Sequence, residues 1–248
     1  MPAPSELRIP LDSGRLAVAL GSHWPEPVLT KQTPSTNRDL AEAARAEAPA
    51  WTIHTTDHQS AGRGRLERSF DMPDCAGIAL SVLARPNPNA PLSWTWLPHV
   101  VGLAVTDVLA QLEVDAVLKW PNDVLTKHQG KLAGILVERV ETPSGPAVVI
   151  GVGLNVSLTR EERPTEQATS LLLEGASTLD RQEIVVLLAG SIRRWFGLWE
   201  SGAKQEIETA YREKCITLGQ HVRIIREGTE DVIGIAQDVD RFGCLIVD

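Results

Sequence analysis

AVLKWPNDVLTKHQGKLAGILVERVETPSGPAVVIGVGLNV, residues 116–156, carries the clearest pattern of successive strands in the chain. It contains three apolar, β-branched segments, at 116–120, 131–140 and 147–156, each with the length and composition of a strand. The links between them are short and rich in turn-forming residues. Because consecutive strands with short links usually pair antiparallel, we predict an antiparallel sheet over this region.

Helical patterns lie on both sides of this stretch. Between Leu97 and Leu112 the apolar residues recur at the spacing that puts them on one helical face. Thr36 and Asp39 have the spacing of a capping box at the start of another helix. Further segments complete the pattern: helices over 36–48, 180–200 and 203–215, and strands over 51–57 and 77–84.

Glycines divide the C-terminal segment into short strands. These strands are predicted over 221–226, 232–238 and 244–247. The sequence therefore predicts an α+β fold, with a mixed sheet and packed helices over residues 1–216. A small barrel-like β domain is expected over residues 217–248.

Composition limits the classes of function. The 248 residues carry a formal net charge of −8 and no run of basic residues, which argues against nucleic acid as a partner. No apolar run is long enough for a membrane span and no signal peptide is visible, so we expect a cytoplasmic protein without a membrane partner. Three widely spaced cysteines, Cys75, Cys215 and Cys244, are expected as reduced thiols.

The segment Gln59-Ser60-Ala61-Gly62-Arg63-Gly64-Arg65 follows a predicted strand directly. Two glycines let the backbone bend around an anion, and two arginines can grip it, so phosphate or carboxylate is the natural guest. The alternative is a solvated surface loop, or an arginine-glycine segment of the kind found in RNA-binding tails.

A second candidate segment is Lys119-Trp120-Pro121-Asn122-Asp123, followed by Gly130-Lys131-Leu132-Ala133-Gly134. A hairpin at this point would bring Asp123 close to Lys131, and Gly134 would let a ligand approach the backbone. The alternative is a plain hairpin with a stabilising turn.

The third segment is Gly151-Val152-Gly153-Leu154-Asn155. It lacks the third glycine and the following helix of a dinucleotide fingerprint. Alternate glycines leave one face of a strand without side chains, where either a flat ligand or a crossing helix could lie.

Other catalytic signatures are missing from the sequence. His54 and His58 would be separated by roughly 13 Å along a strand, too far to share a zinc ion. No Walker loop and no serine-hydrolase elbow occur. We therefore expect no protein-bound metal.

Together and in this order, these segments and Ser35-Thr36-Asn37 resemble the biotin protein ligase family. The likeness extends over about residues 30–156, and helices followed by a small β domain also fit the family. The resemblance implies a catalytic domain of the biotin/lipoate ligase type and an SH3-like C-terminal β-barrel. It further implies an enzyme that uses ATP to convert biotin to biotinoyl-5'-AMP and then biotinylates a lysine of a biotin carboxyl carrier protein.

The resemblance also implies roles for individual residues. The biotin and adenylate contacts would come from Ser35, Thr36, Asn37, Gln59, Gly62, Arg63, Gly64, Arg65, Lys131, Gly134 and Gly153. The ATP contacts would come from Arg68, Phe70, Asn122 and Asn155. Arg65 and Lys131 would offset the charge that develops at the α-phosphate, and Asp123 would orient or deprotonate the target lysine. Magnesium is expected only as part of the ATP complex.

The sequence departs from the family at several positions. Phe70 stands where many relatives have a tryptophan that stacks on adenine, and Glu67 stands where glycine is common. About 30 residues before the first motif leave no room for the winged helix of the bifunctional relatives, so the monofunctional type is expected.

Two alternative functions share part of this pattern. A lipoate protein ligase has the same fold and adenylate chemistry but lacks this form of the glycine-arginine loop. A non-catalytic biotin-binding sensor would not need Lys131, Arg65 and Asp123.

Overall fold

The computed structural model describes residues 4–64, 70–90, 92–226 and 228–248. The helices are α1 (Pro4–Leu7), α2 (Ser13–Leu20), α3 (Thr36–Arg45), the 3-10 helix η2 (Trp94–Trp96), α4 (Leu97–Gln111), α5 (Leu171–Glu174), α6 (Arg181–Ser201) and α7 (Lys204–Lys214). The strands are β1 (Val28–Thr33), β2 (Ile53–Gln59), β3 (Gly77–Ala84), β4 (Ala116–Lys119), β5 (Asp123–Thr126), β6 (Lys131–Val140), β7 (Ala147–Asn155), β8 (His221–Ile224), β9 (Val232–Val239) and β10 (Leu245–Val247).

Seven strands form the central sheet in the order β1-β2-β3-β7-β6-β5-β4. The pair β1–β2 is parallel, whereas the other neighbours pair antiparallel, so the sheet is mixed. The predicted α+β class is therefore confirmed. The predicted pairing of 131–140 with 147–156 is also confirmed, with Gly134 opposite Gly153.

The sequence reasoning was incomplete at β5. No strand was predicted over Asp123–Thr126, which were left in the link between two predicted strands, but they form a strand that lies between β4 and β6. Four residues are too few to show a period of two, and for this reason the pattern was missed. The exposed edge strand β1 and helix α2 were not predicted either, because an edge strand carries little buried alternation to detect.

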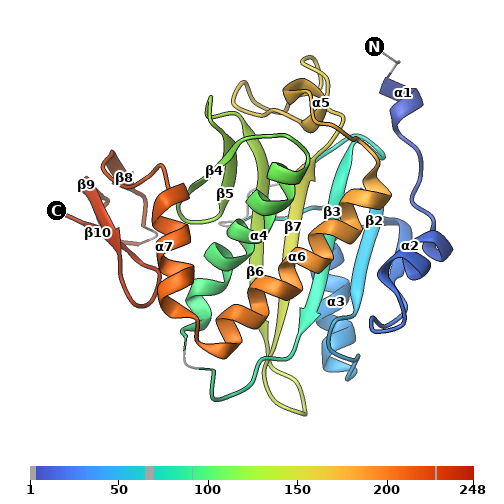
Figure 1. Cartoon of the computed structure of the whole chain (residues 1–248), viewed down its shortest axis with the longest axis horizontal. Coiled ribbons are helices and arrows are strands. Elements are labelled where there is room, and N and C mark those ends of the chain that lie inside the picture. The colour runs from blue at the N-terminus through green and yellow to red at the C-terminus, as the bar shows by residue number, and fades with distance from the viewer. Residues whose placement is uncertain (1–3, 65–69, 91, 227) are drawn as a thin grey trace.

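Helices cover both faces of the sheet. Helices α4 and α6 lie together in front of it in Figure 1, and α3 lies behind it. Helix α4 is buried along most of its length, and the Ser191 hydroxyl of α6 donates to the Ala104 carbonyl of α4 at 3.0 Å. The largest apolar core therefore lies between the sheet and these two helices, because it gathers the buried residues of both layers.

Helix α3 begins at a different cap from the one predicted. The Ser35 side chain accepts from the Arg38 backbone N–H, so Ser35 is the N-cap and no Thr36–Asp39 capping box forms. The Asp39 carboxylate instead accepts from the Thr33 hydroxyl and lies 4.0 Å from His54.

The strands β8, β9 and β10 form a separate antiparallel sheet beyond α7 (Figure 1). A turn of this unit contacts the main body through the Gly243 carbonyl oxygen. This oxygen accepts from the Trp120 indole at 3.0 Å and lies 2.9 Å from His99 Nε2. Gly243 has a φ of +74°, which favours glycine at this position.

Within the described ranges, no helix is both long and apolar enough to cross a bilayer. All three cysteines are free thiols, as expected.

The buried His54 predicts acid sensitivity of stability. Burial lowers the pKa of His54 from 6.5, and nearby Asp39 opposes this shift more weakly. As the pH falls through 6.5, the unfolded chain takes up a proton on His54 before the folded chain does. The free energy of unfolding is therefore fully present above pH 6.5 and decreases as the pH falls below it. Urea unfolding at pH 7.5 and 5.5 should show a smaller loss of stability for His54→Gln than for the unaltered protein. The exposed residue His221 provides the control, because His221→Gln should keep the full loss, and equal losses in all three proteins would contradict the prediction.

Candidate active site

A strip without large side chains crosses the middle of the sheet. In the strand register, Ala79 is opposite Gly153, Gly153 is opposite Gly134, and Gly134 is opposite Asp123. Residues that are paired across strands point to the same face. The strip therefore forms a floor without large side chains of its own, and Asp123 stands at one end of it.

Lys131 and Asp123 form an ion pair at that end. The Lys131 Nζ atom lies 2.7 Å from Asp123 Oδ1, with the lysine side chain 41% exposed and the aspartate 24% exposed. The end of the lysine side chain lies 3.9 Å from the position that a Cβ on Gly134 would occupy. The predicted proximity of these two residues is confirmed, and the lysine ammonium lies within reach of the glycine floor.

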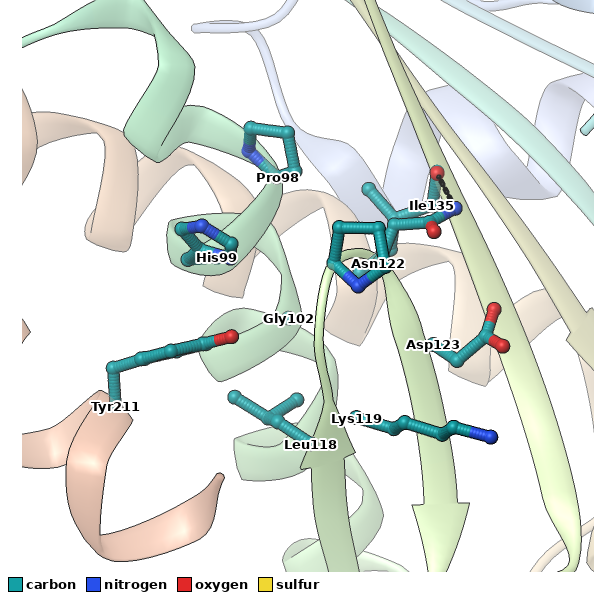
Figure 2. A pocket seen from close by; sticks show the side chains of 10 residues that line it. Pro98, His99, Gly102, Leu118, Lys119, Asn122, Asp123, Ile135 and Tyr211 are labelled. Carbon is teal, nitrogen blue, oxygen red and sulfur yellow. Dashed lines mark hydrogen bonds between the residues drawn. The ribbon is translucent and has the colours of Figure 1, made fainter. Parts of the chain in front are cut away.

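The turn before Asp123 is held by hydrogen bonds between Asn122 and the backbone of β6. The Asn122 side chain donates to the Ile135 carbonyl at 2.7 Å, and the Ile135 N–H donates to the Asn122 carbonyl at 3.0 Å. Figure 2 shows a small pocket beside this turn, between α4, β4 and α7. Lys119 and Asp123 extend toward the same side in this view, as their cross-strand pairing requires.

A polar cluster lies further along the same face of the sheet. The Gln59 Oε1 atom accepts from the Thr36 N–H at 2.9 Å and lies 3.1 Å from the Thr36 hydroxyl. Ser35, Thr36 and Asn37 are all buried. The end of β2 and the start of α3 therefore bring these four predicted site residues together.

Sequence reasoning missed two members of this cluster. The buried Ser81 hydroxyl of β3 lies 2.8 Å from Thr36 Oγ1 and 2.6 Å from Asn37 Oδ1, and Glu138 accepts from the Asn37 amide at 2.7 Å. A single serine in an apolar strand was the available signal, but only the register places it under α3.

The glycine-arginine segment begins at this cluster. Gly62 is buried, and a Cβ on it would lie 2.1 Å from the Phe70 carbonyl oxygen and 2.9 Å from Gln59 Nε2. Arg63 is exposed and Gly64 is half-buried. Glycine is required at position 62 because the returning chain passes too close for any side chain.

Phe70 covers part of the floor. Its ring carbons lie 2.4 to 3.0 Å from the position that a Cβ on Gly153 would occupy. The neighbouring Gly151 is likewise covered, by Asn37 Oδ1. The crossing-helix alternative is confirmed at Gly151, because Asn37 belongs to α3, whereas the flat-ligand alternative stays a prediction.

Three predicted site residues are farther from this arrangement or outside the described residues. Asn155 is buried, and its amide donates to the carbonyls of Thr169 at 2.9 Å and Lys131 at 3.3 Å. It therefore supports the start of β6. Arg65 and Arg68, together with Glu67, lie outside the described residues.

The resulting arrangement combines three chemical features. Buried hydroxyl and amide groups can recognise a polar ring, the glycine floor can accept a flat chain, and Lys131 with Asp123 can handle an anion and a proton. This combination suits an elongated ligand with a polar ring at one end and an acid at the other.

Comparison with known proteins decides the family. Residues 29–155 match the sequence profile of the biotin/lipoate A/B protein ligase family, and residues 217–248 match that of the biotin protein ligase C-terminal domain. The chain belongs to the biotin/lipoate A/B protein ligase family. The resemblance inferred from the motifs is thereby confirmed.

Relatives within this family extend over nearly the whole chain. A biotin--[acetyl-CoA-carboxylase] ligase of Mycobacterium tuberculosis is 40% identical over 98% of this chain and 91% of its own length. Its counterpart from Paracoccus denitrificans is 33% identical over 87% and 91%. The solved biotin protein ligase of Aquifex aeolicus, in complex with biotin and ATP, superposes with a TM-score of 0.74 at 26% identity, over 89% of this chain and 90% of that one.

Proposed function

We propose that this protein is a biotin–[biotin carboxyl-carrier protein] ligase. It uses ATP to convert biotin to biotinoyl-5'-AMP and transfers the biotinoyl group to one lysine of a carrier protein. The Lys131–Asp123 pair above the Gly134–Gly153 floor is the observation that carries this proposal. The 40% identity to a mycobacterial ligase of the same reaction supports it.

Biotin lies along the glycine floor in this proposal. Its ureido ring meets Ser35, Thr36 and Gln59, and its acid end reaches Lys131. Ser81 lies two residues along β3 from Ala79, which corresponds to roughly 7 Å at strand rise. Such a separation allows the ureido ring to lie over the cross-strand row of Ser81 and the acyl chain to lie over that of Ala79. Gly62, Gly64 and Asn37 shape the part of the site that holds the ring.

In the first half-reaction a carboxylate oxygen of biotin attacks the α-phosphorus of ATP. The bond from that phosphorus to the bridging oxygen breaks, and pyrophosphate leaves with the electron pair. Lys131, Arg63 and Arg65 offset the negative charge that grows on the α-phosphate. Arg68, Phe70, Asn122 and Asn155 are proposed to contact ATP, and stacking by Phe70 requires its ring to leave Gly153.

Magnesium enters this scheme on the triphosphate. Among the described residues, no cluster of three or more His, Cys, Asp or Glu side chains is suited to a metal. Magnesium is proposed only as part of the ATP substrate complex, held by phosphate oxygens.

In the second half-reaction the amine of the carrier lysine attacks the anhydride carbonyl. An amide bond forms and AMP leaves. The amine must first lose a proton, and Asp123 is proposed to orient it and accept that proton. The carboxylate stands beside the floor rather than beneath it, and its 24% exposure leaves it accessible to an incoming side chain.

A cytoplasmic location is part of the proposal. ATP and a carboxylase carrier are available in that compartment. The three free thiols agree with a reducing environment.

Incubation of the pure protein with ATP, magnesium, biotin and a biotin carrier domain tests the proposal. Mass spectrometry should show a gain on the carrier equal to one biotinoyl group and no gain with lipoate. A gain with lipoate alone would identify a lipoate ligase. Biotin binding without pyrophosphate release would identify a non-catalytic sensor.

A further inference from the structure

In the hydrogen-bond cluster behind Thr36, the neighbouring groups determine which atoms donate and which accept. Asn37 Nδ2 donates to the Leu136 carbonyl at 3.1 Å and to Glu138 Oε2 at 2.7 Å. Both partners are acceptors, so the amide nitrogen must face β6 and Asn37 Oδ1 must face Ser81. The orientation of this amide therefore follows from its neighbours.

The Ser81 hydroxyl must therefore donate its hydrogen to Asn37. Asn37 Oδ1 has no hydrogen to give, so the contact of 2.6 Å requires Ser81 to donate. A hydroxyl has one hydrogen, and Ser81 is therefore unable to donate to Thr36 Oγ1, which lies 2.8 Å away. Thr36 must therefore donate its own hydrogen to Ser81 Oγ, because two hydroxyl oxygens 2.8 Å apart with no hydrogen between them would repel each other; the contact with Gln59 Oε1, at 3.1 Å, is the longer one.

Gln59 is oriented in the same way. The Thr36 backbone N–H is a donor only, so the atom that faces it at 2.9 Å must be the Gln59 oxygen. The Gln59 amide nitrogen then points toward Gly62, at the base of the glycine-arginine segment. Thr36 thus offers a lone pair, whereas Gln59 offers an N–H group.

We propose that Ser81 and Asn37 are positioning residues that hold the Thr36 hydroxyl as a hydrogen-bond acceptor, so that the site selects a ring carrying an N–H group. This inference rests on the proposed function, because the cyclic urea of biotin has N–H groups and a carbonyl oxygen to match Thr36 and Gln59. Burial strengthens the selection: Ser81, Thr36 and Asn37 are 0%, 3% and 6% exposed, and water does not readily replace a lost partner.

Isothermal titration of the full chain with two kinds of ligand tests the inference. One ligand is biotin, and the others are isosteric cyclic carbamates in which one ring N–H is replaced by oxygen. The unaltered protein should bind at least one carbamate about tenfold or more weakly than biotin, the factor for one ordinary hydrogen bond. Ser81→Ala should weaken biotin binding by about tenfold. In this variant the dissociation constant for that carbamate should exceed the one for biotin by only about threefold or less, because Thr36 is then free to donate.

Two further variants separate positioning from loss of structure. Ser81→Cys keeps a weak donor and should fall between serine and alanine in its biotin affinity. Ser191→Ala also removes a buried hydroxyl, but on α6 against α4, so it should lower the melting temperature and leave ligand preference unchanged.

The inference is overturned if Ser81→Ala binds biotin as the unaltered protein does. It is also overturned if the variant weakens biotin and carbamates by one common factor, or if the unaltered protein binds them all equally. Absence of biotin binding by the unaltered protein would instead refute the proposed function itself.

Discussion

Replacement of Lys131 by alanine is expected to lower the rate of biotinoyl-5'-AMP formation by about 10²- to 10³-fold, the usual effect of losing one group that stabilises developing negative charge. Lys131 lies 2.7 Å from Asp123 and beside Gly134, where the acid and the α-phosphate meet in the proposed reaction. Biotin-dependent exchange of pyrophosphate into ATP measures this step without the carrier. Biotin affinity should fall much less than the rate, because the ring contacts remain.

A matched control exists at the next turn. Lys127 forms an exposed ion pair with Asp115 away from the floor, so Lys127→Ala removes the same chemical group from a similar setting. This control should keep the exchange rate of the unaltered protein. An exchange rate in Lys131→Ala equal to that of the control would remove Lys131 from the mechanism.

The change Asp123→Asn should separate the two half-reactions. Asparagine keeps an oxygen for Lys131 but no longer accepts a proton, so adenylate formation should remain within about threefold. Transfer to the carrier should fall by roughly 100-fold or more, the range expected for loss of a general base. Single-turnover transfer from preformed biotinoyl-5'-AMP, followed by carrier mass, measures the second step alone.

The pH profile of transfer sharpens this test. If Asp123 acts as a base, raising the pH should recover part of the lost transfer in the variant, since more of the amine is then deprotonated without help. Asp115→Asn provides the paired control and should transfer normally. Normal transfer by Asp123→Asn, together with normal adenylate formation, would withdraw the assigned role.

Several features of the fold could be predicted because they depend on local chemistry. The spacing of apolar residues in α4 and the apolar runs of β3, β6 and β7 are visible without any contact information. The strand β5 and the edge strand β1 were missed, since the first is too short to show a pattern and the second is largely exposed. The boundary between 1–216 and 217–248 stays a prediction.

The candidate site likewise has features that follow from local sequence and features that depend on distant contacts. The sequence by itself determined the family, through the order of the motifs at Ser35-Thr36-Asn37, Gln59–Arg65, Lys119–Asp123, Lys131–Leu136 and Gly151–Asn155. It also determined that Asp123 and Lys131 meet, because a short antiparallel connection leaves little choice.

The side chains that stand behind the reacting ones could not be inferred before the packing of the chain was known. Ser81 reaches Thr36 and Asn37 across 45 and 44 residues of sequence, and Asn37 reaches Glu138 across 101. Such contacts depend on strand register and on where α3 crosses the sheet, and both are set by the packing of the whole core. A local sequence pattern carries no information about which distant hydroxyl will supply the one available proton.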